Sequence, residues 1–392
     1  MFGVTFISNY FNHHQIPFSE AMTHLPNINF TFVATTPFDQ ARASLGYKDE
    51  NNKYPYIVRA YENKSSEKIA RELALTDDVV ILGDAPDEYI IPRLKANKIT
   101  FKYSERLYKR GLSIKTIPRA IIGAWLHHGR FQKYPLYMLC ASAFTAADCA
   151  KFGNYINRTY RWGYFPAINR LDEEELFKKK HTDKKVSILW AGRLIRWKHP
   201  DASIFVADKL KKQGYTFNLN IIGNGELENE LKSLIDKLNL HDCVHMLGSM
   251  QPEKVQMYMA ESDIFLFTSD FHEGWGAVLN ESMGNGCAVV ASHAIGSVPF
   301  LIKNKENGLV YHSDNLDELL KCVMFLMDNP ELRLTIAKNA YHTIIHTWNA
   351  DIAAKRLLKL YDNLLVSQGN VCSLYSDGPC SPAPIIKNEW FV

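Results

Sequence analysis

The sequence predicts an α/β fold built from two doubly wound, parallel-sheet domains. Short β-rich apolar segments alternate with helical patterns through most of the 392 residues, which is typical of repeated β-α-β units. The pattern occurs twice, and a polar, charge-dense segment at 166–185 separates the two halves and is interpreted as a linker. We expect the two domains to face each other across a central cleft, because ligands bind beyond the carboxyl ends of the strands in open parallel sheets.

The first half, residues 1–165, contains five predicted strands with amphipathic helices between them. The strands are expected at 2–7, 28–35, 78–83, 99–103 and 137–143, and two of the helices at 66–75 and 87–97.

The second half, residues 186–348, repeats the theme. Its strands are expected at 186–191, 217–222, 243–247, 263–268 and 287–291. A helix at 226–238 carries a leucine every three or four residues on one face. The segment 349–365 predicts a long helix that crosses back onto the first domain, and 366–392 predicts an irregular tail.

The composition is that of a globular protein, with 46% apolar and 22% charged residues. The net charge of +3 is too small to indicate nucleic-acid binding. No signal-peptide pattern opens the chain, and no apolar run reaches the roughly 18 residues of a spanning helix. Seven scattered cysteines in mostly apolar settings indicate reduced thiols and a cytoplasmic protein.

The most informative segment is 269–291, which follows an apolar strand and leads through a glycine-containing loop into a helix expected to begin near Gly276. Glu273 precedes that helix, and Glu281 is expected about one and a half turns inside it, roughly 7 Å from its start. A helix N-terminus suits a diphosphate, and Gly274 and Gly276 allow close backbone approach. The carboxylate before the helix could bind the hydroxyls of a sugar, and the carboxylate inside the helix could bind those of a ribose. The segment therefore predicts a nucleotide-sugar site.

Arg193 and Lys198 lie in the loop after the first strand of the second half, at the same strand-end edge as Glu273. An arginine offers a forked contact to a phosphate and a lysine a point charge, so the two cations suit a departing diphosphate.

The combination of GR(x4)K, GNGE and E(x7)E, the last as EGWGAVLNE, resembles glycosyltransferase family 4. Members are retaining enzymes with the two-lobed GT-B fold, and the resemblance is close over about 186–365. It implies that 186–348 is the nucleotide-sugar-binding domain and 1–165 the acceptor-binding domain. It implies that Arg193 and Lys198 bind the donor diphosphate, Glu273 the transferred sugar and Glu281 the ribose. It further implies backbone contacts from Gly276, Ala277 and Val278, and base contacts from the Gly223–Glu226 turn and the Ser249–Met250 loop. The donor would be a UDP-, GDP- or ADP-sugar, with no cofactor, and the absence of a DxD motif agrees with metal-independent chemistry.

One feature departs from the family pattern. Many relatives carry a histidine just after a first-domain strand, whereas here the strand 99–103 is followed by Ser104, Glu105 and Arg106. Glu105 is therefore either the first-domain catalytic group or an ion-pair partner, for example of Arg106. His13 and His14, in the loop after the first strand, are the alternative residues on the acceptor side.

The segment 102–133 is strongly basic and contains a single acid, Glu105. Its cations are Lys102, Arg106, Lys109, Arg110, Lys115, Arg119, Arg130 and Lys133, with aromatic residues and isoleucines between them. It is either a solvated basic face or a patch that lies on an anionic membrane. We favour the membrane, because acceptors in the family are often lipid-linked. No nucleic-acid-binding motif accompanies the charge.

These observations predict a retaining hexosyltransferase that acts on a saccharide or lipid-linked saccharide during synthesis of a cell-surface polysaccharide, such as a capsule or lipopolysaccharide. Two alternatives remain open from the sequence. One is a phosphorylase of the same fold or a sugar-nucleotide epimerase, and the other is a non-catalytic subunit of a glycosyltransferase complex.

Overall fold

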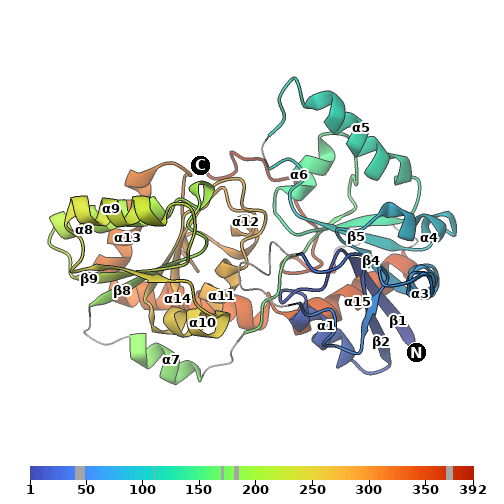
Figure 1. Ribbon diagram of the computed structural model, residues 1–392, viewed down its shortest axis with the longest axis horizontal. Helices are drawn as coiled ribbons and strands as arrows, with labels where there is room; N and C mark the ends of the chain where they lie inside the picture. The colour runs from blue at the N-terminus through green and yellow to red at the C-terminus, as the bar shows by residue number, and fades with distance from the viewer. Residues whose placement is uncertain (40–48, 110, 169–171, 181–184, 368–373) are drawn as a thin grey trace. The chain divides into compact units, whose positions relative to one another are not determined.

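The computed structural model describes residues 1–392 except 40–48, 110, 169–171, 181–184 and 368–373 (Figure 1). The chain forms two compact units. Unit 1 comprises Met1–Ala167 and Asn349–Lys387, and unit 2 comprises Ile168–Trp348 and Asn388–Val392.

Unit 1 is built on a seven-stranded parallel sheet with the order β3-β2-β1-β4-β5-β6-β7. The strands are β1 (Phe2–Ser8), β2 (Ile28–Ala34), β3 (Ile57–Arg59), β4 (Val79–Leu82), β5 (Thr100–Ser104), β6 (Leu136–Cys140) and β7 (Thr159–Arg161). The helices are α1 (Ile16–Thr23), α3 (Lys64–Thr76), α4 (Ile91–Lys95), α5 (Ile117–His127), α6 (Thr145–Ala150) and α15 (Ala350–Val366). Short 3₁₀ turns lie at η1 (Asp87–Tyr89) and η2 (Gly129–Phe131). Because the order runs outward in both directions from β1 and β4, the sheet is doubly wound.

Unit 2 repeats this plan with six parallel strands in the order β10-β9-β8-β11-β12-β13. The strands are β8 (Val186–Ala191), β9 (Phe217–Ile222), β10 (Val244–Gly248), β11 (Ile264–Phe267), β12 (Ala288–Ser292) and β13 (Leu309–Tyr311). The helices are α7 (Glu173–Lys180), α8 (Pro200–Lys212), α9 (Glu228–Leu238), α10 (Pro252–Glu261), α11 (Val278–Gly284), α12 (Val298–Leu301), α13 (Leu316–Asp328) and α14 (Pro330–His346), and a 3₁₀ turn forms at η3 (Arg196–Lys198).

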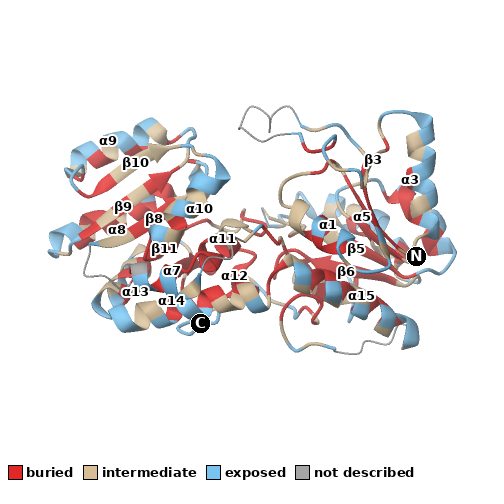
Figure 2. Ribbon diagram, turned by 90° about the horizontal axis from the view of Figure 1, so that it is seen from below, coloured by how far each residue is buried: buried red, intermediate tan, exposed pale blue. Residues whose placement is uncertain are grey.

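In each unit the core lies between the sheet and its helices. Figure 2 shows the strands of both sheets mostly buried, while helices such as α3 and α9 are exposed on their outer face. The central strands β4 and β11 are buried at every position, which explains why they are continuous apolar runs in the sequence. Helix α9 buries Leu231 and Ile235 on its inner face, and Leu234 and Leu238 of the predicted leucine face are half-buried beside them.

The strands predicted from the sequence are confirmed to within a few residues, and the differences concern short or peripheral elements. The sequence analysis missed β3, β7 and β13, which have three residues each and form sheet edges. Such strands are too short to display a period of two. The helix expected at 87–97 is divided into η1 and α4.

Helix α7 lies within 166–185, the segment interpreted as a linker, and the sequence analysis did not predict it. The inner face of this helix buries Leu176 and Phe177 in the core of unit 2, and Phe177 packs edge-on against Tyr341 of α14. Two buried apolar residues in a helix otherwise composed of Glu and Lys give too weak a periodic signal to be recognised.

The tail after α15 contacts both units. In unit 1 its backbone pairs with the edge strand β7, where Thr159 Oγ1 donates to the Ala383 carbonyl oxygen at 3.1 Å. In unit 2 the indole N–H of Trp390 donates to the His293 carbonyl oxygen at 2.9 Å. The tail thus has no helix among its described residues but is held by specific hydrogen bonds.

Candidate functional site

The best-defined group of polar residues in unit 2 lies beyond the carboxyl ends of β8 and β11. Lys198 Nζ lies 2.5 Å from Glu273 Oε2, and Ser269 Oγ donates to the same carboxylate oxygen at 3.0 Å. The Lys198 and Glu273 side chains are only 14% and 11% exposed to solvent. The structure thus brings together two predicted site residues that are 75 positions apart, as a largely buried ion pair.

Thr268 attaches the loop that carries Lys198 to the end of β11. Its hydroxyl donates to the Lys198 carbonyl oxygen at 2.6 Å and accepts a hydrogen bond from the indole N–H of Trp190 at 2.9 Å. The backbone N–H of Asp270 donates to the Trp197 carbonyl oxygen at 3.0 Å. These bonds fix the two loops to each other, and with them the separation of the lysine and the glutamate.

At two positions of the predicted site only glycine fits, because neighbouring atoms lie where a Cβ atom would stand. A Cβ atom on Gly223 would stand 1.8 Å from the Gly192 carbonyl oxygen, and the φ of Gly223 is +143°. A Cβ atom on Gly276 would stand 2.4 Å from the Phe267 ring, and its φ is +85°. A side chain at either position would displace a strand-end loop. These glycines therefore determine the shape of the site, independently of any contact with a ligand.

Arg193 is exposed, and among the described residues it has no ion-pair partner. Its guanidinium lies 5.9 Å from the centre of the Trp197 ring, and Lys198 Nζ lies 4.8 Å from the same ring. Trp197 was missed in the sequence analysis, although its position between the two cations was a usable signal. The site therefore has one cation engaged by a carboxylate and one exposed to solvent.

The position expected for Glu281 needs correction. Helix α11 begins at Val278 rather than near Gly276, so Glu281 lies in its first turn and not one and a half turns inside. Burial raises the pKa of the Glu281 carboxyl from 4.5 to about 7. No group of the described residues donates a hydrogen bond to this carboxylate. A ligand that offers hydroxyl donors would favour the ionised form.

The remaining predicted donor-side residues surround the same strand ends. Gly274 lies in the turn that precedes α11, and Ala277 and Val278 form the start of that helix. Met250 follows β10, whose last residue, Gly248, accepts a hydrogen bond from the Gly223 N–H at 2.9 Å.

A second polar group lies in unit 1, beyond the carboxyl end of β5. The Tyr164 hydroxyl donates to Glu105 Oε1 at 2.5 Å, and Lys109 Nζ lies 2.5 Å from Glu105 Oε2. Arg106, the ion-pair partner suggested for Glu105, instead pairs with buried Asp148 at 3.4 Å. The ion-pair partner of Glu105 is thus Lys109 and not Arg106.

The two histidines predicted for the acceptor side, His13 and His14, lie in the same group as Glu105. The ring of His14 stacks on Tyr164 with centroids 5.2 Å apart and an interplanar angle of 10°, and the His13 and His14 rings are 3.8 Å apart. Burial raises the pKa of Tyr164 well above its ordinary value, so its hydroxyl remains a donor to Glu105. Tyr164 was missed because it follows β7, which the sequence analysis did not recognise as a strand.

The basic segment 102–133 is not one continuous patch. Lys102 is buried and pairs with Asp87 at 2.5 Å, and Arg106 is buried against Asp148, so neither is available to a partner surface. Arg110 lies outside the described residues. The exposed cations are those from Lys115 onward.

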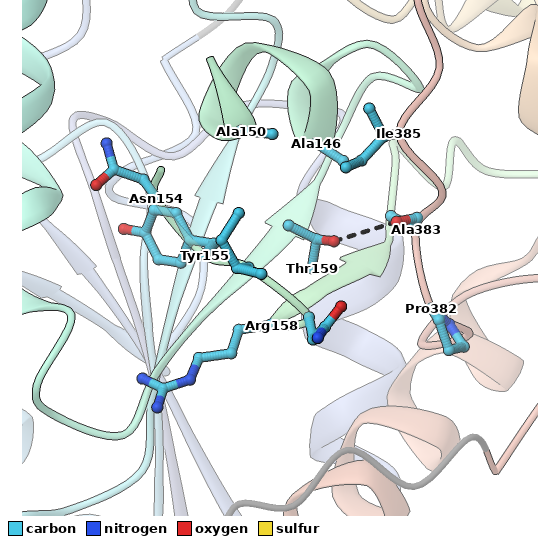
Figure 3. A pocket seen from close by; sticks show the side chains of 11 residues that line it. Ala146, Ala150, Asn154, Tyr155, Arg158, Thr159, Pro382, Ala383 and Ile385 are labelled. Carbon is cyan, nitrogen blue, oxygen red and sulfur yellow. Dashed lines mark hydrogen bonds between the residues drawn. The ribbon is translucent and has the colours of Figure 1, made fainter. Parts of the chain in front are cut away.

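A cavity of about 590 Å³ lies elsewhere in unit 1, between α6, the loop before β7 and the tail (Figure 3). Its lining includes Tyr155, Arg158 and Ile385, and none of the predicted site residues contributes to it. Arg158 directs its guanidinium to the carbonyl oxygens of Gln132 and Tyr134. The cavity therefore does not belong to either polar group.

Two doubly wound parallel sheets in one chain are the plan of the GT-B class of proteins. The chain belongs to the glycosyl transferases group 1 family, which is glycosyltransferase family 4; the family model matches residues 172–343. It is 34% identical over 290 residues, 72% of this chain and 73% of the relative, to the N-acetylgalactosamine-N,N'-diacetylbacillosaminyl-diphospho-undecaprenol 4-alpha-N-acetylgalactosaminyltransferase of Campylobacter jejuni.

Other comparisons agree. The chain is 30% identical over 200 residues to the amylovoran biosynthesis glycosyltransferase AmsK of Erwinia amylovora, with 49% of each chain covered. It thus spans about half the length of this curated relative. Among solved structures, Anabaena HepE in complex with UDP matches with a TM-score of 0.69 at 16% identity, covering 93% of this chain and all of that one. This likeness identifies the fold as GT-B.

Proposed function

We propose that this protein is a retaining glycosyltransferase that moves a hexose from a nucleoside diphosphate sugar to a saccharide or lipid-linked saccharide in bacterial cell-surface polysaccharide synthesis. The observation that carries the proposal is the Lys198–Glu273 pair beside exposed Arg193, at the strand ends of unit 2. The relatives support it, since their names describe amylovoran biosynthesis and a sugar transfer to a diphospho-undecaprenol acceptor.

In this proposal the cations receive the departing diphosphate. An ammonium group has three N–H donors, so Lys198 can keep its bond to Glu273 and still donate to a phosphate oxygen. Arg193 is free to add a forked contact. Both charges are then in place where negative charge develops as the sugar–phosphate bond breaks.

Glu273 would orient the transferred sugar through its hydroxyls, and Glu281 would accept hydrogen bonds from the ribose. The acceptor oxygen bonds to the anomeric carbon on the face that the diphosphate leaves, while the carbon–oxygen bond to the diphosphate breaks. The acceptor proton passes to the departing diphosphate oxygen. Configuration is thereby retained without a nucleophile from the protein.

Unit 1 would supply the acceptor side. Glu105 is held by Tyr164 and Lys109, and the stacked His13 and His14 lie next to Tyr164. A carboxylate and two imidazoles suit the hydroxyl groups of a saccharide, as acceptors and as donors. We assign this group to acceptor binding.

The donor is identified by measuring hydrolysis across a panel of UDP-, GDP- and ADP-sugars, with free phosphate and a glucan as the phosphorylase control. One nucleotide-sugar hydrolysed well above the others supports the proposal and fixes base and sugar together. Turnover that requires free phosphate would contradict it, and so would an absence of nucleotide binding.

The role of Glu273 is tested by Glu273→Gln, with Glu228→Gln as the matched control. Glu228 also pairs with a lysine, Lys232 at 2.7 Å, but on the exposed face of α9. Glu273→Gln should lower kcat by about 100-fold or more, while Glu228→Gln leaves it unchanged. Near-normal turnover of a folded Glu273→Gln protein would remove Glu273 from the proposed chemistry.

A further inference from the structure

Helix α5 of unit 1 exposes an unusual number of large apolar side chains. Ile114, just before the helix, is 89% exposed, and Trp125 within it is 59% exposed. The other exposed apolar residues of this surface are Ile117, Ile121, Ile122 and Leu126. We call these six residues the α5 face. In Figure 1, α5 is the outermost helix at the top of unit 1.

The arrangement around the helix is the reverse of a normal core-facing pattern. Ala124 is the buried residue of α5, so small side chains face the protein. Ile117, Ile121 and Trp125 recur every four residues and form one outward stripe, and Ile122 and Leu126 form the stripe beside it. By comparison, α9 of unit 2 buries its leucine face and exposes its charges. An apolar face this size, exposed to water, indicates a binding surface.

The charged side chains in the sequence segment around the α5 face, Arg106 to Ala147, have a single sign. The sequence contains no acidic residue from Arg106 to Ala147. Within this stretch Lys115, Arg119, Arg130 and Lys133 are exposed. Exposed cations beside exposed isoleucines and a tryptophan complement an anionic lipid bilayer, whose headgroups are negatively charged and whose acyl chains lie just beneath them.

A bilayer matches this surface better than a second copy of the chain does. Two copies joined through the α5 face would bring their cations together, and like charges at an interface are unfavourable. Helix α5 has 11 residues, about 16 Å, which is roughly half the thickness of a hydrocarbon core. Among the described residues, no helix is both long and apolar enough to pass through a membrane. The fitting geometry is a helix that lies in the plane of the interface.

We propose that the α5 face docks unit 1 on an anionic membrane surface, with Ile114, Ile121, Ile122 and Trp125 inserted at the level of the acyl chains. Arg119 and Lys133 contact the lipid phosphates. The proposal goes beyond sugar transfer, since it concerns a surface that contains none of the residues assigned to donor or acceptor binding. Docking would deliver the chain to acceptors that are anchored in the bilayer.

The first test is flotation of the purified protein with phosphatidylcholine vesicles, prepared with and without phosphatidylglycerol. Wild type should float with the anionic vesicles, and less so in high salt. The double variant Ile121→Ser/Trp125→Ser and the double variant Arg119→Gln/Lys133→Gln should each reduce binding by at least about tenfold. The matched control, Met257→Ser/Phe325→Ser on α10 and α13 of unit 2, also removes two exposed apolar side chains and should float like wild type.

Two further measurements separate docking from misfolding and from the proposed transfer activity. Lipids brominated in the acyl chain should quench the emission of Trp125 in wild type, and Trp125→Phe should abolish that quenching. Donor hydrolysis, which needs no acceptor, should be unchanged in every α5 variant. Flotation of the Ile121→Ser/Trp125→Ser protein at the wild-type level would overturn the proposal. A dimer of wild type that this variant converts to a monomer would also overturn it, by assigning the face to a second copy.

Discussion

The two units place a carboxylate at a strand end and hold it in nearly the same way, yet the two arrangements differ in origin and in environment. In unit 2 Glu273 pairs with Lys198 across 75 residues, and both side chains are largely buried. In unit 1 Glu105 pairs with Lys109 four residues away, and the side chains are 27% and 37% exposed. The N–O distance is 2.5 Å in both.

The comparison shows that two ion pairs with the same N–O distance can contribute differently to the stability of the fold. A buried long-range pair fixes two loops of the fold, and its loss leaves a charge with little solvent around it. A local, partly exposed pair is screened by water and is worth little. Each carboxylate also accepts a hydroxyl hydrogen bond, from Ser269 in unit 2 and from Tyr164 in unit 1. Each glutamate therefore has one lysine and one hydroxyl partner, and corresponding partners can be replaced in turn.

The largest expected contrast is in activity. Lys198→Met should lower kcat by about 100-fold or more, because it removes a cation where negative charge develops. Lys109→Met should lower kcat by no more than about threefold, since its pair is partly exposed and is assigned to the acceptor side rather than to the diphosphate. Steady-state transfer assays of both variants measure the contrast. Equal losses would mean that the two pairs have equivalent roles.

The next contrast is in stability. Lys198→Met leaves Glu273 uncompensated and should reduce the free energy of unfolding by about 3 kcal/mol. Lys109→Met should reduce it by less than about 1 kcal/mol, because water screens Glu105. Urea unfolding of the two variants without ligand measures both values. A larger loss for Lys109→Met would contradict the argument from burial.

Glu281 adds a pH dependence to the expected behaviour of unit 2. Its pKa of about 7 means that the carboxyl is mostly protonated at pH 6 and mostly ionised at pH 8. Because the ionised form accepts hydrogen bonds from the ribose hydroxyls, the Kd for a nucleotide-sugar should be about tenfold higher at pH 6 than at pH 8. A nucleotide-sugar is the suitable probe, since its diphosphate does not titrate in this range.

The same pKa determines how Glu281 affects the ligand-free protein. A carboxyl whose folded pKa is raised contributes stability below pH 4.5, and that contribution is lost as pH rises through about 7. Glu281→Gln should therefore stabilise the ligand-free protein at pH 8, by at most about 3 kcal/mol, while weakening donor binding there. Isothermal titration and thermal unfolding at pH 6 and 8 measure both effects. A pH-independent Kd in wild type would exclude Glu281 as the ribose acceptor.

The smallest expected effects come from the two hydroxyls. A hydrogen bond to a charged group contributes about 1.5 kcal/mol or somewhat more. Ser269→Ala should therefore lower kcat for donor hydrolysis by about tenfold. Tyr164→Phe should leave donor hydrolysis unchanged and raise the acceptor KM by about threefold to tenfold. If Tyr164→Phe instead lowered donor hydrolysis, the division of roles between the two units would be wrong.

Sequence reasoning was most successful where the chemistry lies in one or two continuous segments. Glu273, Gly276 and Glu281 fall in a single strand-loop-helix stretch, and their loop could be placed at a strand end from the apolar run before it. The unit 1 group was only partly recognisable, because His14, Glu105 and Tyr164 come from three distant segments. The sequence analysis suggested Arg106 as the partner of Glu105, and the structure pairs Glu105 with Lys109.

By itself the sequence determined the two parallel-sheet units, most of their strands and the presence of acid and base residues at the strand ends of unit 2. These follow from local periodicity and from the rule that strand ends share one edge of a sheet. The tertiary structure decided which charges are paired and which are exposed. It buried Lys102 and Arg106, joined Lys198 to Glu273 and left the isoleucines and Trp125 of α5 on the surface. Burial and pairing depend on contacts between residues far apart in the chain, which a local pattern does not encode.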